Sequence, residues 1–351
     1  MSEKFTIDRR HFLSAATIMV AAGPFAMIGP ASAAPARKRS TGRIPFKANA
    51  EPLGTIKQVK AGLLNVGYAE VGPAAGSPVI LLHGWPYDIH SFADAAPLLA
   101  AKGYRVIIPY LRGFGTTRFL SEKTFRNGQQ SVVSADIIDL MDALNLKKAI
   151  IGGFDWGARA ANIIAALWPE RCKALVSVSG YLIGSQQANI APLPPKAEQS
   201  WWYQYYFATA RGRFGYDANR LDFAKLIWHT ASPEWQFDDS TFERSAVAFD
   251  NPDHVDIVIH NYRWRLGLAK GESKYDSFEK KLAAGPFITV PTITLEGDAN
   301  GAPHPDPASY ATKFKNKYAH HTVKGGIGHN LPQEAPRAFA EAIMEADRLG
   351  D

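Results

Sequence analysis

The sequence predicts an α/β protein with a mostly parallel central sheet, flanking helices and an inserted helical cap. Two patterns predict it. From about Leu53 onward, short apolar runs rich in β-branched residues alternate with longer amphipathic stretches, which is typical of a sheet covered by helices. Between residues 181 and 286 the alternation stops, and the sequence becomes aromatic, charged and helix-like. Because strand-like runs return at residue 287, the cap interrupts one core that comprises residues 53–180 and 287–351.

The strands and helices of the core are predicted from the period of their apolar residues. We expect seven strands, at residues 63–71, 78–82, 105–109, 148–152, 174–178, 291–295 and 320–323. The predicted helices between them include residues 91–102, 132–144 and 158–168.

The composition fits a globular chain and argues against some classes of function. The chain has 351 residues, 46% hydrophobic and 21% charged, which is enough apolar material for one large core. The net charge of +6 is modest and forms no long basic stripe outside the N-terminal region, so nucleic acid is not an expected partner. Cys172 is the only cysteine, which excludes an intrachain disulfide and a cysteine-based metal site.

The first 33 residues have the pattern of an export signal. The pair Arg9-Arg10 precedes an apolar run from Ala15 to Ile28, and Ala31-Ser32-Ala33 supplies the small residues of a cleavage site. The segment resembles a twin-arginine signal peptide, which implies transient contact with the twin-arginine export machinery and a periplasmic or secreted protein without a stable membrane anchor. The alternative is an N-terminal anchor or tail, but the apolar run is short and broken by glycine. Residues 34–52 are expected to form a basic leader.

An acidic residue stands at a predicted strand-to-helix turn. Gly153-Phe154-Asp155-Trp156-Gly157 follows a hydrophobic strand and leads directly into a helix. This matches a nucleophile elbow in which aspartate replaces the usual serine. The backbone N–H groups at a helix start favour an anion, and a carboxylate can attack carbon to form an ester. Asp155 is therefore the candidate nucleophile, and the alternative is that it only caps the helix.

Further segments supply the partners that such a nucleophile needs. Trp85, in His83-Gly84-Trp85-Pro86, follows a strand where half of an oxyanion hole is expected, and the backbone N–H groups of Trp85 and Trp156 are the candidate donors. Asp298 follows a late strand, and His329 lies in a glycine-rich loop. Taken singly, Asp298 could be a turn residue and His329 a surface histidine. The order nucleophile, acid, histidine predicts a catalytic triad.

These motifs resemble the α/β-hydrolase superfamily, and within it the epoxide hydrolase branch, from about Leu53 to Ala346. The resemblance implies the α/β-hydrolase fold and two lid tyrosines that hold the epoxide oxygen. We assign these roles to Tyr203 and Tyr262, with Tyr205 or Tyr206 as substitutes for Tyr203; the structural alternative is that these aromatic residues are lid core. The sequence departs from the family's usual pattern at Pro109-Tyr110-Leu111-Arg112-Gly113 and at Asn330 after the histidine.

The resemblance implies opening of an epoxide to a vicinal diol. Asp155 forms an ester, which is then hydrolysed by water activated by His329 and Asp298, and no metal or organic cofactor is required. The aromatic residues around the site suggest a small apolar or aromatic epoxide.

Two other functions remain open. A haloalkane or haloacid dehalogenase would use the same triad, although Trp85 stands where many haloalkane dehalogenases carry asparagine. A non-enzymatic binding protein on a hydrolase scaffold is more remote, because no triad residue is missing from the sequence. An esterase is weaker still, since no serine occupies the elbow.

Overall fold

The computed structural model describes residues 53–350. The predicted signal peptide and basic leader lie outside these described residues and stay predictions. Within the described part of the chain, no helix is both long and apolar enough to cross a membrane.

A nine-stranded sheet forms the centre of the structure, in the order β1-β2-β4-β3-β6-β7-β8-β9, with β5 paired to β2. The pairs from β4 to β9 are parallel, whereas β1, β2 and β5 pair antiparallel. The prediction of a mostly parallel sheet is confirmed. The strands are β1 (Lys57–Ala61), β2 (Leu64–Val71), β3 (Ser77–Leu82), β4 (Tyr104–Pro109), β5 (Arg118–Phe119), β6 (Ala149–Gly153), β7 (Cys172–Val178), β8 (Thr292–Gly297) and β9 (Tyr318–Val323).

All seven predicted strands are present, and the sequence analysis missed β1 and β5. Three of the five residues of β1 are polar and exposed, and Val59 and Ala61 stand singly among them, so this edge strand has no apolar run that would reveal it. The two residues of β5 are too few to show a period.

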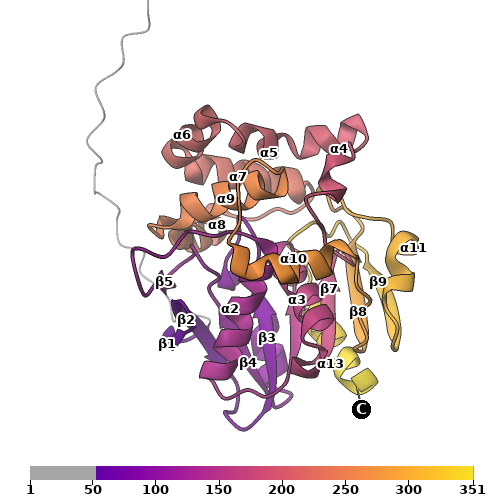
Figure 1. Cartoon of the computed structure of the whole chain (residues 1–351). Helices are drawn as coiled ribbons and strands as arrows, with labels where there is room; N and C mark the ends of the chain where they lie inside the picture. The colour runs from indigo at the N-terminus through magenta and orange to yellow at the C-terminus, as the bar shows by residue number, and fades with distance from the viewer. Residues whose placement is uncertain (1–52, 351) are drawn as a thin grey trace, which may run out of the picture. The chain divides into compact units, whose positions relative to one another are not determined.

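Helices cover both faces of the sheet. Helix α1 (Ala95–Ala100) connects β3 to β4, and helix α3 (Trp156–Leu167) connects β6 to β7. The two connections run in opposite directions along the sheet, because β4 lies on one side of β3 and β7 on the other side of β6. Right-handed crossovers therefore place α1 and α3 on opposite faces. Helix α2 (Gln130–Ala143) packs beside α3, as Figure 1 shows, and α13 (Pro336–Gly350) packs against α1.

The predicted helix at residues 91–102 is wrong in part, because the segment is divided in two. A short 3₁₀ turn covers Ile89–Phe92, and α1 begins only at Ala95. The side chain of Asp88 accepts a hydrogen bond from the backbone N–H of His90 and so starts the first turn separately. Pro97 lies in the first turn of α1, where its missing N–H is tolerated.

Seven α-helices lie between β7 and β8, in the segment predicted as the cap. Residues 181–286 contain helices and turns and no strand. In Figure 1 helices α4 to α9 lie above the sheet, whereas α10 crosses lower, near α2 and α3. The helices are α4 (Pro195–Ser200), α5 (Trp202–Phe207), α6 (Ala210–Ala218), α7 (Arg220–Ala231), α8 (Asp239–Ala246), α9 (His254–Arg265) and α10 (Asp276–Ala283).

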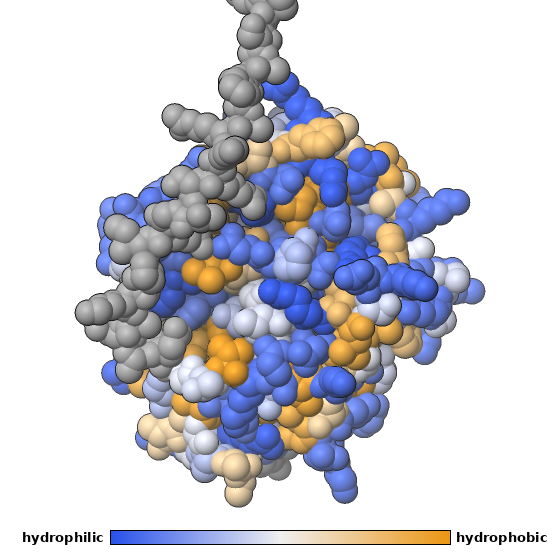
Figure 2. All heavy atoms as spheres, turned by 90° about the vertical axis from the view of Figure 1, so that its left-hand side faces the viewer, coloured by the Kyte–Doolittle hydropathy of each residue, from blue (hydrophilic) through white to orange (hydrophobic). Residues whose placement is uncertain are grey.

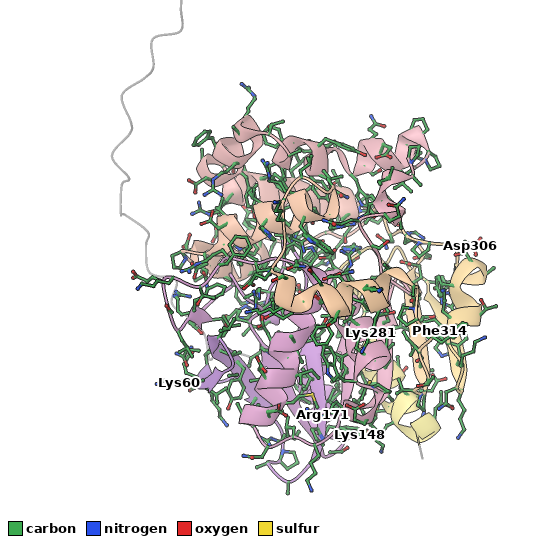
Figure 3. All side chains as sticks on the ribbon, in the orientation of Figure 1. Lys60, Lys148, Arg171, Lys281, Asp306 and Phe314 are labelled. Carbon is green, nitrogen blue, oxygen red and sulfur yellow. The ribbon has the colours of Figure 1, made fainter. Side chains whose placement is uncertain are left out.

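The inserted helices share one hydrophobic core with the sheet. Phe207 and Trp228 from these helices belong to the same buried cluster as Leu82 and Ile151 from the strands. Figure 3 shows side chains filling the space between the two, while the labelled Lys148 and Arg171 lie at the opposite end of the strands. On the face drawn in Figure 2, hydrophobic residues form small separate groups among hydrophilic ones. The inserted helices are therefore packed firmly over the carboxyl ends of the strands.

Candidate active site

Asp155 occupies a strained turn between β6 and α3. Its backbone has φ 52° and ψ −123°, in a region that side chains other than glycine rarely adopt. The turn is possible because its surroundings are small: a Cβ atom at Gly157 would overlap the carbonyl of Leu82, and one at Gly84 would overlap the Asp155 side chain. This backbone conformation directs the Asp155 carboxylate away from the sheet and into a pocket.

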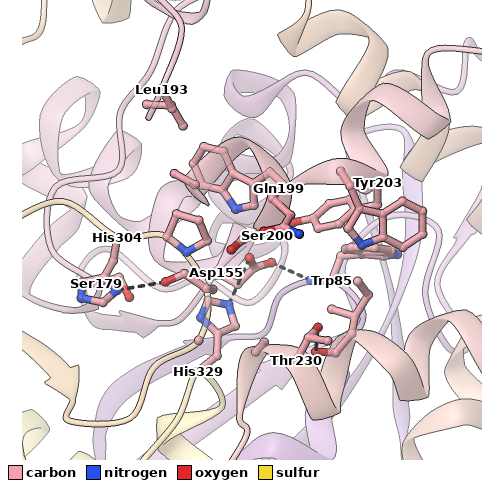
Figure 4. A pocket seen from close by; sticks show the side chains of 18 of the residues that line it. Trp85, Asp155, Ser179, Leu193, Gln199, Ser200, Tyr203, Thr230, His304 and His329 are labelled. Carbon is pink, nitrogen blue, oxygen red and sulfur yellow. Dashed lines mark hydrogen bonds and ion pairs between the residues drawn. The ribbon is translucent and has the colours of Figure 1, made fainter. Parts of the chain in front are cut away.

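The two carboxylate oxygens of Asp155 have different partners. The backbone N–H of Trp85 donates to Oδ1 at 2.8 Å, and Nε2 of His329 lies 3.4 Å from Oδ2 (Figure 4). Burial on its own would raise the pKa of this carboxyl. The hydrogen bond and charge of His329, with the backbone N–H groups of two tryptophans, outweigh burial and hold the pKa of Asp155 below its ordinary value. The carboxylate is therefore ionised at neutral pH, as a nucleophile requires.

The loop that carries His329 is held by two polar side chains. The hydroxyl of Ser232, just after α7, accepts a hydrogen bond from the backbone N–H of His329 at 2.9 Å. Glu334 accepts from the backbone N–H groups of Gly328 and Asn330 at 2.7 and 3.1 Å, and Ser232 donates to the same carboxylate. These contacts fix the backbone on both sides of the histidine. Sequence analysis did not identify either side chain.

The prediction that Asp298 orients His329 is wrong. The Asp298 carboxylate is exposed and accepts hydrogen bonds from the backbone N–H groups of Gly325, Gly326 and Ile327 at 2.9 to 3.0 Å. Nδ1 of His329 is buried and has no hydrogen-bond partner among the described residues. Three backbone donors in one turn satisfy the carboxylate more fully than one imidazole would. Asp298 therefore shapes the loop that leads to His329 and does not contact the imidazole.

The two predicted lid tyrosines lie together beside Asp155. Tyr203 from α5 and Tyr262 from α9 line the same pocket as Asp155 and His329, and their ring centroids are 5.3 Å apart. Of the two alternatives to Tyr203, Tyr205 is exposed and hydrogen-bonds to Glu198.

Tyr206, the other alternative, stacks on Phe223 away from the pocket lining. Burial raises the pKa of Tyr203 and of Tyr262 above the ordinary value, and the charge of Asp155 adds to the effect. Both phenols therefore stay protonated and can donate hydrogen bonds over the whole neutral range.

The pocket has a volume of about 630 Å³, a size typical of sites for small organic molecules. Trp85, Trp201 and Trp202 supply an aromatic wall. Figure 4 shows Gln199 and Ser200 above the carboxylate, with Leu193 farther out. Two charged residues in the lining were not predicted: Arg159 and Arg265.

Both arginines stand at helical spacing from a residue that the sequence did identify. Arg159 follows Asp155 by four residues on α3, and Arg265 follows Tyr262 by three on α9. Residues three or four apart share one face of a helix, so this spacing was the available signal. Within residues 53–350 no cluster of three or more histidine, cysteine or acidic side chains could hold a metal ion.

A strained aspartate at a strand-to-helix turn, facing a histidine from a late loop on a mostly parallel sheet, defines an α/β-hydrolase. The chain belongs to this family: residues 77–225 match the profile described as alpha/beta hydrolase fold. The crystal structure of a candidate epoxide hydrolase from Klebsiella pneumoniae is 65% identical, with a TM-score of 0.84, and the match covers 86% of this chain and 100% of that chain.

Curated relatives are named epoxide hydrolases. The epoxide hydrolase of Caballeronia sordidicola is 29% identical over 337 residues, which cover 85% of this chain and 95% of that protein. Epoxide hydrolase B of Mycobacterium tuberculosis is 29% identical over 170 residues, and there the chain spans only 47% of the relative's length. The chain is therefore similar to epoxide hydrolases.

Proposed function

We propose that the protein hydrolyses epoxides to vicinal diols through an ester on Asp155. The observation that carries the proposal is the meeting of an ionised carboxylate, a histidine and two protonated phenols in one aromatic pocket. The names of the relatives support the same reaction.

Ring opening is the first step of the proposed reaction. Oδ2 of Asp155 attacks a ring carbon, the bond from that carbon to the epoxide oxygen breaks, and an ester forms. Tyr203 and Tyr262 donate hydrogen bonds to the oxygen that leaves the carbon, and one of them gives up its proton to it. Oδ1 keeps the hydrogen bond from Trp85 and becomes the carbonyl oxygen of the ester.

Hydrolysis of the ester is the second step. Nε2 of His329 takes a proton from water, and the resulting hydroxide attacks the ester carbonyl carbon. The negative charge that develops on Oδ1 is stabilised by the backbone N–H groups of Trp85 and Trp156. The bond between Cγ of Asp155 and Oδ2 then breaks, so that Oδ2 leaves with the alkyl group as the second oxygen of the diol, and His329 returns its proton to this oxygen while the water oxygen remains in the carboxyl group. The proton of the new carboxyl group passes through solvent to the tyrosinate, which restores the enzyme.

The rival dehalogenase function needs N–H donors for a halide ion. The indole N–H of Trp85 is already donated to the hydroxyl of Tyr216 at 2.8 Å, so this side chain is not available as a halide ligand. Among the described residues the buried indole N–H of Trp156 makes no well-formed hydrogen bond and could serve, although it lies close enough to the Tyr262 hydroxyl to lower the pKa of that phenol. One free donor and two phenols favour an epoxide oxygen over a halide.

The experiment that tests the proposal has two parts. Incubation with styrene oxide should yield phenylethanediol, whereas incubation with a bromoalkane should release no bromide. A His329→Ala variant should then accumulate a peptide that contains Asp155 and has gained the mass of one epoxide molecule, detected by mass spectrometry. Release of bromide without formation of diol would instead identify a dehalogenase. If neither product forms, a binding protein is the better explanation.

We also propose that the protein is exported with its first 33 residues acting as a twin-arginine signal. The basis is the sequence pattern alone. Replacement of Arg9-Arg10 by a lysine pair should leave the protein in the cytoplasmic fraction, whereas the native chain should appear in the periplasm or medium. Equal distribution of both forms would refute export by this route.

A further inference from the structure

Two arginine side chains in the pocket have no acidic partner. Arg159 and Arg265 line the cavity, and no ion pair joins either guanidinium to a carboxylate among the described residues. Nε of Arg159 is buried and lacks any hydrogen-bond partner. Asp155 is the only acidic residue in the lining, and its oxygens face Trp85 and His329. Neither arginine therefore forms an ion pair with Asp155, although the charge of Asp155 acts to raise the pKa of Arg159.

The protein around Arg159 disfavours its positive charge. Arg159 lies at the start of α3, where the helix dipole disfavours positive charge. Burial, and next the charge of Arg265, lower the pKa of Arg159 to about 9. Arg265 is held by the aromatic faces of Trp201 and Tyr262, with its guanidinium carbon 5.7 and 5.6 Å from the ring centroids. The charge of Asp155 offsets part of the lowering of the Arg159 pKa, but neither guanidinium has an ion-pair partner among the described residues, so a bound anion would stabilise both arginines.

We infer that Arg159 and Arg265 bind a carboxylate of the substrate, so that the substrate class is an epoxide that carries a carboxylate. The inference rests on the proposed function and names the substrates of that same site. Guanidinium groups match a carboxylate with paired hydrogen bonds. Since Arg159 is one helical turn from Asp155, an acid bound there holds its epoxide near the nucleophile.

The size of the cavity narrows the substrate class further. At about 630 Å³ the pocket is larger than an epoxide with a single carboxylate would fill. The aromatic side chains of Trp85, Trp202 and Tyr203 in the lining can pack against an apolar or aromatic group of the substrate. A substrate with an aromatic ring, an epoxide and a carboxylate uses all three parts of the lining.

A matched pair of substrates tests the inference. The sodium salt of 3-phenylglycidic acid and its neutral amide differ only in the group that the arginines would bind. The wild-type enzyme should prefer the acid in kcat/KM by at least about tenfold, the effect of one charge-assisted hydrogen bond. Arg265→Gln and Arg159→Gln should each remove most of this preference, chiefly by raising KM for the acid more than KM for the amide. Arg265→Lys should restore part of the preference.

Arg213→Gln is the control variant. Arg213 lies on α6 and pairs with Asp256 at the surface, outside the pocket lining, so its loss removes one positive charge without touching the site. Its preference for the acid should equal that of the wild type. Equal turnover of acid and amide by the wild-type enzyme, or an unchanged preference in both pocket variants, would overturn the inference.

Binding of an unreactive analogue separates this failure from failure of the proposed function. Cinnamate carries a double bond in place of the epoxide and should bind to the wild type at least about tenfold more tightly than cinnamamide, measured by calorimetry. Tight cinnamate binding without hydrolysis of any epoxide would retain the anion site and reject epoxide hydrolysis. Formation of diol together with equal binding of cinnamate and cinnamamide would retain epoxide hydrolysis and reject the anion site.

Discussion

Replacement of the lid tyrosines by phenylalanine tests the proposed ring opening most directly. Tyr203 and Tyr262 line the pocket with Asp155, and their ring centroids lie 5.1 and 5.3 Å from that of Trp85. Both pKa values are raised above the ordinary one, mainly by burial, so the phenols act chiefly as neutral hydrogen-bond donors to the developing alkoxide. Loss of one such donor costs about 10²-fold in rate, or about 2.7 kcal/mol. We expect that loss for each single variant.

The double variant should lose less than the product of the two single effects, because both phenols serve one oxygen. The rate of ester formation can be followed by stopped-flow tryptophan fluorescence, since Trp85 contacts both rings. Tyr205→Phe is the matched control: Tyr205 lies on the same helix as Tyr203 but is exposed and bonded to Glu198. Single variants within about threefold of the wild type on styrene oxide would refute the assignment of the tyrosines.

Three further predictions concern the loop, the pH dependence and the stability. Asp298→Asn should lower kcat/KM far less than the roughly 10⁴-fold expected when a triad histidine loses its acid. The reason is that the Asp298 carboxylate bonds only to backbone N–H groups of its loop. A loss of about 10⁴-fold would show that Asp298 is the acid of the triad after all. The rate of ester formation should not change between about pH 7 and 8, because the lowered pKa of Asp155 keeps it ionised there and the raised pKa of each lid tyrosine keeps it protonated. A stopped-flow profile with a limb inside this range would contradict these pKa directions. Asp136→Ala should lower the free energy of unfolding, measured by urea titration, by about 3–5 kcal/mol. The variant leaves the buried Arg112 without the two 2.6 Å hydrogen bonds that it donates to Asp136. A loss under about 1 kcal/mol would show that this ion pair does not stabilise the fold.

The Arg112 pair also explains one departure from the family pattern. Tyr110 stands where the usual Asp-x-Arg-Gly motif has aspartate, but Arg112 itself is kept and buried, bonded to Asp136 and to the carbonyl of Asn127. The substitution therefore leaves the structural role of the motif intact.

The sequence by itself determined the sheet and the strand-to-helix turn that carries Asp155. Buried parallel strands need continuous apolar runs, and the turn at Asp155 needs glycines around it, so both leave a local mark on the sequence. Motifs next to Tyr203 and Tyr262 in the chain also predicted that both belong to the site, and both line the pocket. Short-range geometry carries this information because each feature is made by residues that are close in sequence.

Only the tertiary structure decided which distant groups meet. Whether the carboxylate of Asp298 turns toward His329 or toward its own loop depends on backbone donors 27 to 29 residues away, and no local pattern encodes that choice. The pairing of Arg159 with Arg265 likewise arises from the packing of an inserted helix over α3. Side-chain direction is set by the competition among all neighbours in space, and this competition exists only once the chain has folded.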